Sequence, residues 1–405
     1  MKEGWVYKSA GEVFTITDFV SNGSFASLRE NVKYLDHPDY AVLIRLADYS
    51  NGFDKNKFVY VSKQSYEYLA KSKLFGGEII MSNVGSIGKS FLCPNLDCPM
   101  TIGPNAILIR SNNNKFFLYY FQSEDFNKKL LSISSRATLK KFNKTNFKTL
   151  SIPVPPLPDQ QRIVSYLDAE FAKIEALKAN AEKQLQAAKD LFQAALKELL
   201  TPKEGWVEKK LGEVAKSMAD GPFGSNLKAQ HYTTKKEVRI VQLSNIGEFG
   251  WKEENVKYTS FEHLKTISRS EVHCGDIVIA KMMPAGRAII CPNNEAKYVL
   301  SSDAVKVELK DGYSPDFIMY SINSNWFNKQ VLANVTGSGR IRTSLTKLRD
   351  CNLYIPDIET QKEVVEELNM AYMKTKALQT SYTETITLCN DLKQALLKKV
   401  FEEDG

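Results

Sequence analysis

Long apolar runs are missing from this chain of 405 residues. No stretch of about 18 consecutive apolar residues occurs, so a membrane-spanning helix is not expected. The opening residues, MKEGWVYKSAGEV, also lack the apolar segment of a signal peptide. We therefore expect a cytoplasmic protein that does not contact a membrane.

Cysteine and histidine, which are frequent metal ligands, are few and scattered. The chain has six cysteines and four histidines, and its one close cysteine pair, Cys93 and Cys98, does not have the two-residue spacing of common zinc sites. We therefore expect no structural metal. The cysteines are expected to be reduced and mostly buried.

What the chain does contain is a second copy of itself. The segment KEGWVYKSAGEV at residues 2–13 returns as KEGWVEKKLGEV at residues 203–214, an offset of 201 residues. Further matched segments follow in the same order: NGSFAS at 22–27 with DGPFGS at 220–225, GGEIIMSNVGSIGKSFLCPN at 76–95 with CGDIVIAKMMPAGRAIICPN at 274–293, FNKKLLSISSR at 126–136 with FNKQVLANVTG at 327–337, and LSIPVPPLPDQQRIVSYLD at 150–168 with CNLYIPDIETQKEVVEELN at 351–369. A period of this length is far too long for a solenoid, so the chain is a duplicated module of a globular domain plus a helix.

Each repeat ends in a long stripe of mostly apolar residues with helical spacing. Between Ile163 and Leu199, and again between Val364 and Val400, such residues recur every three or four positions, as on one face of a helix. A helix this long with one apolar stripe needs a partner, and two matching stripes favour an antiparallel coiled coil. The alternative is that each helix packs on its own globular domain.

Capping residues suggest where these helices begin and end. Asp159 is a candidate cap of the first helix, and Thr360 with Glu363 is a candidate capping box of the second. Pro202 ends the first helix. The predicted organisation is therefore residues 1–157 as a first globular domain, 158–202 as a central helix, 203–356 as a second globular domain and 357–405 as a C-terminal helix.

The globular halves have the pattern of mixed α and β structure. Short β-rich runs bounded by glycine, proline or asparagine include GEIIMSNV, KSFLCP, NAILIR, GDIVIAK, AIICP and DAVKVEL, and PDFIMYSINSNWFNKQVLAN is helical in pattern. The fold class is α+β, with two repeated domains and two long helices. Trp5 and Trp206, in the repeated opening segment, are expected to be framework residues of these domains.

The sequence lacks the common catalytic and nucleotide-binding motifs. The segment NVGSIGKS at residues 83–90 approaches a phosphate-binding P-loop, but Asn83 replaces the first glycine and the strand-like FLCPN follows where a helix should begin. No methyltransferase motif of the [ND]-P-P-[YF] type, no G-x-S-x-G elbow and no H-E-x-x-H motif occurs. We therefore expect no enzymatic activity and no cofactor on this chain.

Positive charge is concentrated in the two globular repeats. Residues 1–158 have a surplus of seven positive charges and residues 203–357 a surplus of four, whereas the segments 159–202 and 358–405 are slightly acidic. Two basic modules suggest a polyanionic partner.

Three loops in each repeat carry the side chains that bind phosphates and base edges. Lysine and arginine neutralise phosphates, while arginine and asparagine can read bases in the major groove. The candidate DNA-binding residues are Asn22, Ser24, Arg29, Asn83, Lys89, Arg136, Lys140 and Lys141 in the first repeat, and Asn226, Lys228, Lys281, Arg287, Ser338, Arg340 and Arg342 in the second.

Two repeated motifs resemble a known family. The opening GWVxxxLGEV pattern and the segment IPVPPLPDQQRIVSYLD are similar to segments in each half of the DNA-specificity subunit of type I restriction–modification systems. The resemblance covers the whole chain in order. It departs at Asp159, where glutamate is commoner, and in the second copy, where Pro356 stands alone and Thr360 precedes Gln361.

The resemblance implies that each globular half is a target-recognition domain that reads one part of a bipartite site in double-stranded DNA. The helices would form an antiparallel spacer that docks two methyltransferase (M) subunits, and restriction (R) motor-nuclease subunits would complete the complex. S-adenosylmethionine, ATP and Mg²⁺ would belong to these partner subunits. Because the recognition domains vary, no base-contacting residue carries over from the family.

Two other functions are compatible with parts of the pattern. A coiled-coil adaptor whose basic domains bind an acidic protein or RNA would also have this charge distribution. A nucleic-acid enzyme that uses NVGSIGKS to bind a nucleotide would explain the lysine of that segment. Salt-dependent, sequence-selective binding to duplex DNA would argue against the adaptor, and the lack of nucleotide turnover would argue against the enzyme.

Overall fold

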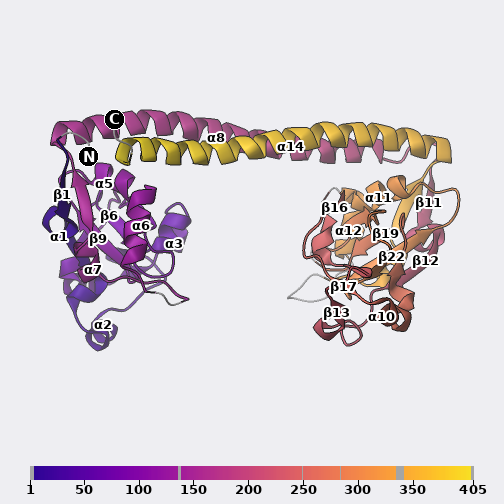
Figure 1. Ribbon diagram of the computed structural model, residues 1–405, viewed down its shortest axis with the longest axis horizontal. Helices are drawn as coiled ribbons and strands as arrows, with labels where there is room; N and C mark the ends of the chain where they lie inside the picture. The colour runs from indigo at the N-terminus through magenta and orange to yellow at the C-terminus, as the bar shows by residue number, and fades with distance from the viewer. Residues whose placement is uncertain (1–3, 136–137, 249, 283, 334–341, 403–405) are drawn as a thin grey trace. The chain divides into compact units, whose positions relative to one another are not determined.

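The computed structural model describes residues 4–402 apart from residues 136–137, 249, 283 and 334–341 (Figure 1). The chain divides into two compact units. Unit 1 comprises Met1–Asn180 with Thr385–Gly405, and unit 2 comprises Ala181–Glu384. Each unit therefore contains one globular domain together with parts of both long helices.

Unit 1 contains two four-stranded sheets. The first is antiparallel and has the order β2 (Thr15–Asp18), β9 (Ala106–Arg110), β6 (Ile79–Ser82), β7 (Ser90–Leu92). The second has the order β4 (Tyr60–Val61), β3 (Ala41–Ile44), β8 (Met100–Ile102), β5 (Lys73–Leu74), with a parallel central pair and antiparallel outer pairs.

Alternate residues of the central strand β6 are buried in two different cores. Ile79 and Met81 pack with the aromatic residues of the helices, whereas Ile80 packs with the second sheet. This alternation is the two-residue period of a strand that is covered on both faces. The domain is thus a layer of helices on a sheet that packs on a second sheet.

The helices of unit 1 lie mainly at the ends of these strands and over the first sheet. Figure 1 shows α5 between that sheet and the long helices. The short helices of the unit are α1 (Ala10–Val13), α2 (Phe25–Asn31), α3 (Leu46–Ser50), α4 (Lys63–Tyr68), α5 (Asn114–Phe121), α6 (Glu124–Ser132) and α7 (Lys144–Lys148).

Unit 2 repeats this topology with one strand added to its second sheet. Its sheets have the orders β12 (Ala215–Asp220), β22 (Ala304–Leu309), β19 (Ile277–Ala280), β20 (Ala288–Ile290), and β13 (Tyr232–Thr233), β17 (Tyr258–Thr259), β14 (Val238–Val241), β21 (Tyr298–Leu300), β18 (Glu271–Val272). Its short helices are α9 (Leu211–Val214), α10 (Phe261–Thr266), α11 (Pro315–Asn323), α12 (Asn325–Ala333) and α13 (Leu345–Arg349). Strand β13 and a hairpin of β15 (Ile246–Gly247) and β16 (Gly250–Trp251) have no counterpart among the described strands of unit 1.

A two-stranded ladder closes each domain beside a long helix. In unit 1, β1 (Val6–Ser9) pairs with β10 (Ser151–Val154), and in unit 2, β11 (Val207–Lys210) pairs with β23 (Asn352–Ile355). The two registers are offset by the 201 residues of the sequence repeat. The strands and mixed architecture expected from the sequence are confirmed, although the helical segment that begins at Pro315 is two helices, α11 and α12, that meet at Ser324.

The repeated tryptophans belong to the framework, as expected. The Trp5 ring meets the Phe116 ring edge-on at 6.4 Å, and the Trp206 ring meets the Phe317 ring edge-on at 5.8 Å. Both pairs connect the opening segment of a repeat to its first core helix, so these rings stabilise the domain.

The two long helices are α8 (Leu157–Leu199) and α14 (Ile358–Phe401). Their most buried positions recur every seven residues. In α8 these include Leu167, Ile174, Ala181 and Ala188. In α14 they include Leu368, Thr375 and Cys389, and Tyr382 at the intervening heptad position is half-buried. A seven-residue repeat is typical of coiled-coil packing. The apolar stripe seen in the sequence, with about 3.6 residues per turn, is therefore wider than the row of buried residues where the helices meet.

The beginnings of the helices differ from the expected caps. Helix α8 begins at Leu157, so Asp159 lies inside its first turn, where its negative charge favours the helix dipole. At α14 the cap is Asp357, whose carboxylate accepts hydrogen bonds from the Thr360 amide at 2.9 Å and its hydroxyl at 2.8 Å. These two bonds hold the pKa of Asp357 below its ordinary value. The capping box expected from Thr360 and Glu363 is therefore wrong.

Both helices contribute to each core, in opposite order. In unit 1, Leu167 near the start of α8 shares a core with Leu397 and Phe401 at the end of α14. In unit 2, Phe192 near the end of α8 shares a core with Leu368 near the start of α14. Within each unit the helices are therefore antiparallel, and each also packs on the globular domain, which combines the two arrangements considered from the sequence.

The described part of the chain has no helix with the length and apolarity needed to cross a membrane.

Candidate nucleic-acid interface

Two of the three candidate loops meet in each unit. In unit 1 the turn after β6 meets the segment before α7: Val84 and Lys141 form a β-bridge, and the Phe142 amide donates to the Asn83 carbonyl at 3.1 Å. In unit 2 the bridge joins Met282 to Arg342, and the Thr343 amide donates to the Lys281 carbonyl at 2.8 Å. Candidate residues far apart in the sequence therefore lie together, at equivalent places of the two repeats.

The turn after β6 is a hairpin and not a phosphate-binding loop. Gly88 and its counterpart Gly286 have φ angles of +82° and +86°, which glycine adopts without strain. Strands β7 and β20 follow, so no helix N-terminus is available to hold phosphates. The structure gives no support to nucleotide binding by NVGSIGKS.

The first candidate loop of unit 1 is partly occupied by internal bonds. The Asn22 amide nitrogen donates to the Phe19 carbonyl and the Ser72 hydroxyl, and its oxygen accepts from the Lys71 amide. Ser24 caps α2 through a hydrogen bond from the Ser27 amide at 3.2 Å. Arg29 lies exposed on the same helix. Of these three candidates, Ser24 and Arg29 are exposed and Asn22 is half-buried.

The remaining described candidates of unit 1 are accessible lysines and one enclosed amide. Lys140 and Lys141 are exposed. The Lys89 ammonium contacts the Ser50 hydroxyl at 3.0 Å and lies over the Tyr49 ring. The side-chain oxygen of Asn83 is buried and has no hydrogen-bond partner among the described residues.

Unit 2 has a cleft where its candidate loops converge. Two adjoining cavities, of about 330 and 370 Å³, share Asp220, Lys281 and Arg342 on their walls. The larger is also lined by Thr343 and the smaller by Asn226. One wall therefore comes from the end of β12, the floor from the end of β19, and the other wall from the segment before α13.

Ion pairs organise the charged groups of this cleft. The Lys281 ammonium lies 2.7 Å from a carboxylate oxygen of Asp220, and the Arg342 guanidinium lies 3.1 Å from the Asp303 carboxylate. The Lys281 side chain is 10% exposed, whereas the Asp220 side chain is 45% exposed. The cleft thus presents both hydrogen-bond donors and acceptors, as base edges require.

The segment after Asp220 is positioned by close backbone packing. A Cβ atom at Gly221 would lie 1.7 Å from the Ser301 carbonyl oxygen, so only glycine fits. Further along, the Asn226 carbonyl contacts His263 at 2.8 Å, and the Lys228 amide donates to His231 at 3.1 Å. The side chains of Asn226 and Lys228 remain exposed.

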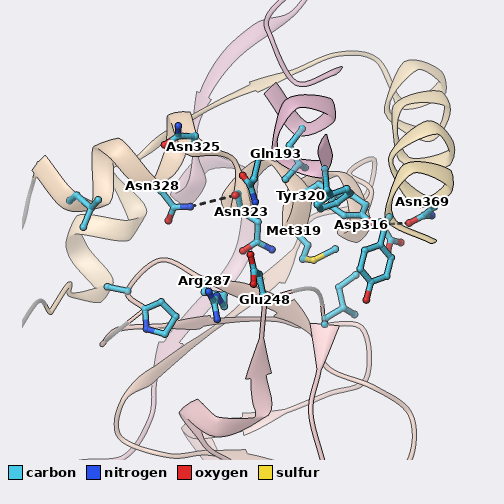
Figure 2. Close-up of a pocket in the computed structure, with 18 residues that line it drawn as sticks. Gln193, Glu248, Arg287, Asp316, Met319, Tyr320, Asn323, Asn325, Asn328 and Asn369 are labelled. Atoms are coloured by element: carbon cyan, nitrogen blue, oxygen red, sulfur yellow. Dashed lines mark hydrogen bonds between the residues drawn. The ribbon is translucent and has the colours of Figure 1, made fainter. Parts of the chain in front are cut away.

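Arg287 lies apart from this cleft. It lines a cavity of about 600 Å³ between the end of α8, the helices α11 and α12, and the β15–β16 hairpin. Figure 2 shows Arg287 and Glu248 beside one another on one side of this cavity, with Asn325 on the other. The candidate is therefore not brought together with Lys281 and Arg342.

Three candidates, Arg136, Ser338 and Arg340, lie outside the described residues. The sequence did not single out Asp220 or Thr343, although both contribute to the cleft. Asp220 opens the repeated DGPFGS segment, which was a usable signal. No sequence signal pointed to Thr343, because a threonine that follows a basic residue is common in loops.

The cysteines offer no reactive group in the cores. Burial raises the pKa of the Cys93 and Cys291 thiols to about 12, so both stay protonated at neutral pH. Cys351 and Cys389 are also buried, as expected. Among the described residues, no three His, Cys, Asp or Glu side chains are grouped to hold a metal.

A family model describes nearly the whole chain. The type I restriction modification DNA specificity domain matches twice, at residues 2–187 and 203–387. The chain belongs to this family. The two matches coincide with the sequence repeat, so each repeat is one specificity domain plus most of its long helix.

Relatives from distant organisms have the same description. The chain is similar to the type I restriction enzyme EcoKI specificity subunit of Escherichia coli K12, with 21% identity over 99% of this chain and 89% of that protein. It is also similar to the putative type I restriction enzyme MjaX specificity subunit of Methanocaldococcus jannaschii, with 24% identity over 88% of this chain and 85% of that protein.

Solved structures share the fold. A structure described under complex assembly and conformational transition of the type I R-M system aligns with a TM-score of 0.73 at 16% identity, covering 100% of this chain and 99% of that chain. The HsdS subunit of Thermoanaerobacter tengcongensis aligns with a TM-score of 0.51 at 16% identity, over 100% and 98% of the two chains. The fold class and the family resemblance expected from the sequence are both confirmed.

Proposed function

We propose that this chain is the DNA-recognition subunit of a type I restriction–modification complex, and that each globular domain reads one half of a bipartite duplex site. The observation that carries the proposal is the double match to a DNA specificity domain, which coincides with the duplicated topology. Each domain has a net positive charge, and in each domain two of the candidate loops are joined by a β-bridge. A bipartite site needs two readers, and the duplication supplies them.

The chain recognises DNA and leaves the chemistry to other subunits. Family membership assigns it specificity, and its relatives are named specificity subunits. The hairpin geometry at Gly88 removes the support for a nucleotide-binding enzyme, and the family match removes the case for a general adaptor. S-adenosylmethionine, ATP and Mg²⁺ would be bound by the partner subunits, in the cytoplasm where the DNA is.

The long helices are suited to docking two modification (M) subunits. Both carry large apolar side chains that stay exposed: Leu177 and Leu191 on α8, and Met370, Met373, Leu388 and Leu392 on α14. Exposed apolar surface of this extent on a helix pair marks a protein interface. Leu177 and Leu191 correspond in the repeat to Leu378 and Leu392, which are also exposed, so the helices offer equivalent apolar positions to two copies of one partner. Restriction (R) subunits would join that core complex. We also propose that helix length sets the spacer between the half-sites.

The direct test is to co-express the chain with a modification subunit of its own system and to map methylated bases across the host genome. We expect one motif made of two specific half-sequences separated by a fixed number of unspecified bases. Methylation at a continuous motif, or none in a complex that assembles, would contradict the proposed function.

A further inference from the structure

The cleft of unit 2 has an acid–base pair on its floor that the fold holds in place. The Lys281 ammonium donates to one oxygen of Asp220 at 2.7 Å. The other Asp220 oxygen has no hydrogen-bond partner in the part of the chain that the structure describes. Because 45% of the Asp220 side chain is exposed, this free oxygen faces the cleft and is available as an acceptor.

Backbone contacts fix both members of the pair. The Asp220 carbonyl accepts from the buried Ser270 hydroxyl at 2.9 Å, and the next amide, of Gly221, donates to the Ala304 carbonyl at 2.9 Å. The Lys281 amide donates to the Asp303 carbonyl at 2.8 Å. Groups held this closely by strand ends have the rigidity that a recognition site requires.

A third group in the cleft points to a ligand. Thr343 is 4% exposed and lines the same cavity, yet its buried hydroxyl has no hydrogen-bond partner among the described residues. A buried polar atom without a partner is costly, so such atoms call for an explanation. A ligand that enters the cleft with hydrogen-bonding groups would supply the missing partner.

The charges of the cleft favour a base edge over a phosphate. Lys281 and Arg342 are each already paired with a carboxylate, and the free Asp220 oxygen would repel a phosphate. A base edge instead requires a donor and an acceptor side by side. Lysine pairs with the guanine acceptors O6 and N7, and aspartate accepts from the cytosine amino group.

We propose that Asp220 and Lys281 together read one G·C base pair in the second half-site. In the major groove, guanine O6 lies beside the cytosine amino group, so the adjacent ammonium and carboxylate match both bases of one pair. The hydrogen left on Lys281 would reach guanine N7. An A·T pair fits less well, because a carboxylate on the adenine amino group would lie beside the N7 acceptor. This assignment rests on the proposed function.

The test uses the complex with its modification subunits and compares Asp220→Asn, Lys281→Met and the unmodified chain. Asp220→Asn keeps the side-chain size, and Lys281→Met keeps the apolar part of the lysine. The matched control is Lys216→Met, which removes an exposed lysine that is ion-paired to Glu308 across β12 and β22. Thermal unfolding checks that each variant is folded, and Asp220→Asn decides the test if Lys281→Met does not assemble.

Binding is measured against duplexes in which each position of the second half-site is varied in turn, at fixed salt. We expect the unmodified complex to require one G·C pair, and both variants to lose about tenfold or more of the discrimination at that position alone. Discrimination elsewhere, and everything in the control, should be unchanged. Intact discrimination in the variants, or equal weakening on all sequences with a smaller salt slope, which indicates a phosphate contact, would overturn the assignment.

The two proposals fail in distinguishable ways. If the unmodified complex has no bipartite specificity, the proposed function is wrong. If the unmodified complex reads a bipartite site and the variants read it equally well, or if the second half-site contains no G·C pair, only the assignment of Asp220 and Lys281 is wrong.

Discussion

The aspartate at the end of the first strand of the first sheet is buried in unit 1 and partly exposed in unit 2. Strand β2 ends at Asp18 and strand β12 ends at Asp220, and each pairs with the equivalent neighbouring strand. Asp18 is 7% exposed and is bonded by the Lys144 ammonium at 3.0 Å and by the Ser21 hydroxyl. Asp220, in contrast, bonds Lys281 and keeps one oxygen toward the cleft. An aspartate at the same position of the fold can therefore stabilise the domain, as Asp18 does, or be available to a ligand, as Asp220 is.

The neighbouring positions change together with the acid. Where unit 2 has Lys281 and Thr343 at the bridge between the loops, unit 1 has Asn83 and Phe142. Phe142 is buried and apolar, whereas Thr343 contributes a hydroxyl to the wall of the cleft in unit 2. The equivalent corners of the two domains therefore carry different chemical groups.

A second contrast concerns strands β3 and β14. Val42 occupies the position in β3 that Arg239 occupies in β14, each paired in parallel with the neighbouring strand. Arg239 is fully buried, and its guanidinium lies near the rings of Trp251 and Tyr258. The extra hairpin of unit 2 supplies Trp251, so the insertion and the buried arginine belong to one local structure.

The largest expected effect concerns the last turn of the chain. The Phe401 ring lies 5.6 Å from the Phe116 ring and 5.5 Å from the Tyr120 ring in the core of unit 1. Phe401→Ala should destabilise unit 1 by about 3–5 kcal/mol, as expected for an aromatic removed from a core. Hydrogen exchange should show lost protection in α5, although this helix lies far from the mutation in the sequence.

The matched variant in unit 2 is Leu200→Ala, at the equivalent position beyond the end of α8. Leu200 is only partly buried, so the loss of protection in unit 2 should be smaller. Equal losses in the two units would show that the helix ends do not anchor the domains in the way described.

The second prediction exchanges lysines at the contrasting corners. Lys144→Met removes a partner from the buried Asp18 carboxylate and should cost about 2–3 kcal/mol of the free energy of unfolding, because a buried charge loses compensation. Lys281→Met leaves Asp220 in contact with water and should cost less than about 1 kcal/mol. Denaturant unfolding followed separately in each unit by hydrogen exchange measures both. A larger cost for Lys281→Met would reverse the comparison.

The third prediction concerns the signature glutamines at the helix starts. Gln160 and Gln361 both donate to a proline carbonyl five residues earlier, at 2.9 Å. Gln361 also accepts from the Ser314 amide at 2.9 Å. Substitution by leucine should therefore cost about 1 kcal/mol at Gln160 and about 2 kcal/mol at Gln361. Thermal unfolding of the two variants gives the ranking, and an inverted ranking would contradict the role of the second bond.

The smallest expected effect depends on pH. In unit 1 the Tyr119 hydroxyl and the Lys115 ammonium donate to Asp168 on α8, whereas in unit 2 the Tyr320 hydroxyl donates to the neutral Asn369 on α14. Burial opposes ionisation of Asp168, but the bonds from Lys115 and Tyr119 outweigh it and lower its pKa below 3.8. The stabilisation is therefore present above about pH 4 and is lost as the pH falls through the lowered pKa.

The free energy of unfolding, measured as the pH is lowered, should show the loss of this stabilisation in the native chain and not in Asp168→Asn. The variant reproduces the neutral pair of unit 2, so its remaining acid dependence should come from other carboxyls. An identical acid dependence in both proteins would show that the Asp168 bonds do not contribute.

The sequence was sufficient for the repeat, the helices and most strands because these depend on local pattern. It misassigned the capping residues, because Asp159 lies inside the first turn of α8 and the cap of α14 is made by hydrogen bonds from Thr360 to Asp357. The residue types of the loops also predicted a DNA contact for Asn22, whose amide is hydrogen-bonded inside the fold. They did not indicate Asp220, which lines the cleft. Which loop side chains face outward depends on long-range contacts that no local pattern contains.

The most direct test of the central claim is to replace residues 14–149 with the equivalent segment of a relative that has a different target. The rest of the chain and the modification subunits stay the same, and methylated bases are mapped genome-wide. If each domain reads its own half-site, one half of the motif changes to that of the relative, and the other half and the spacer remain. A motif that changes in both halves, or in neither while the complex stays active, would contradict independent reading by the two domains.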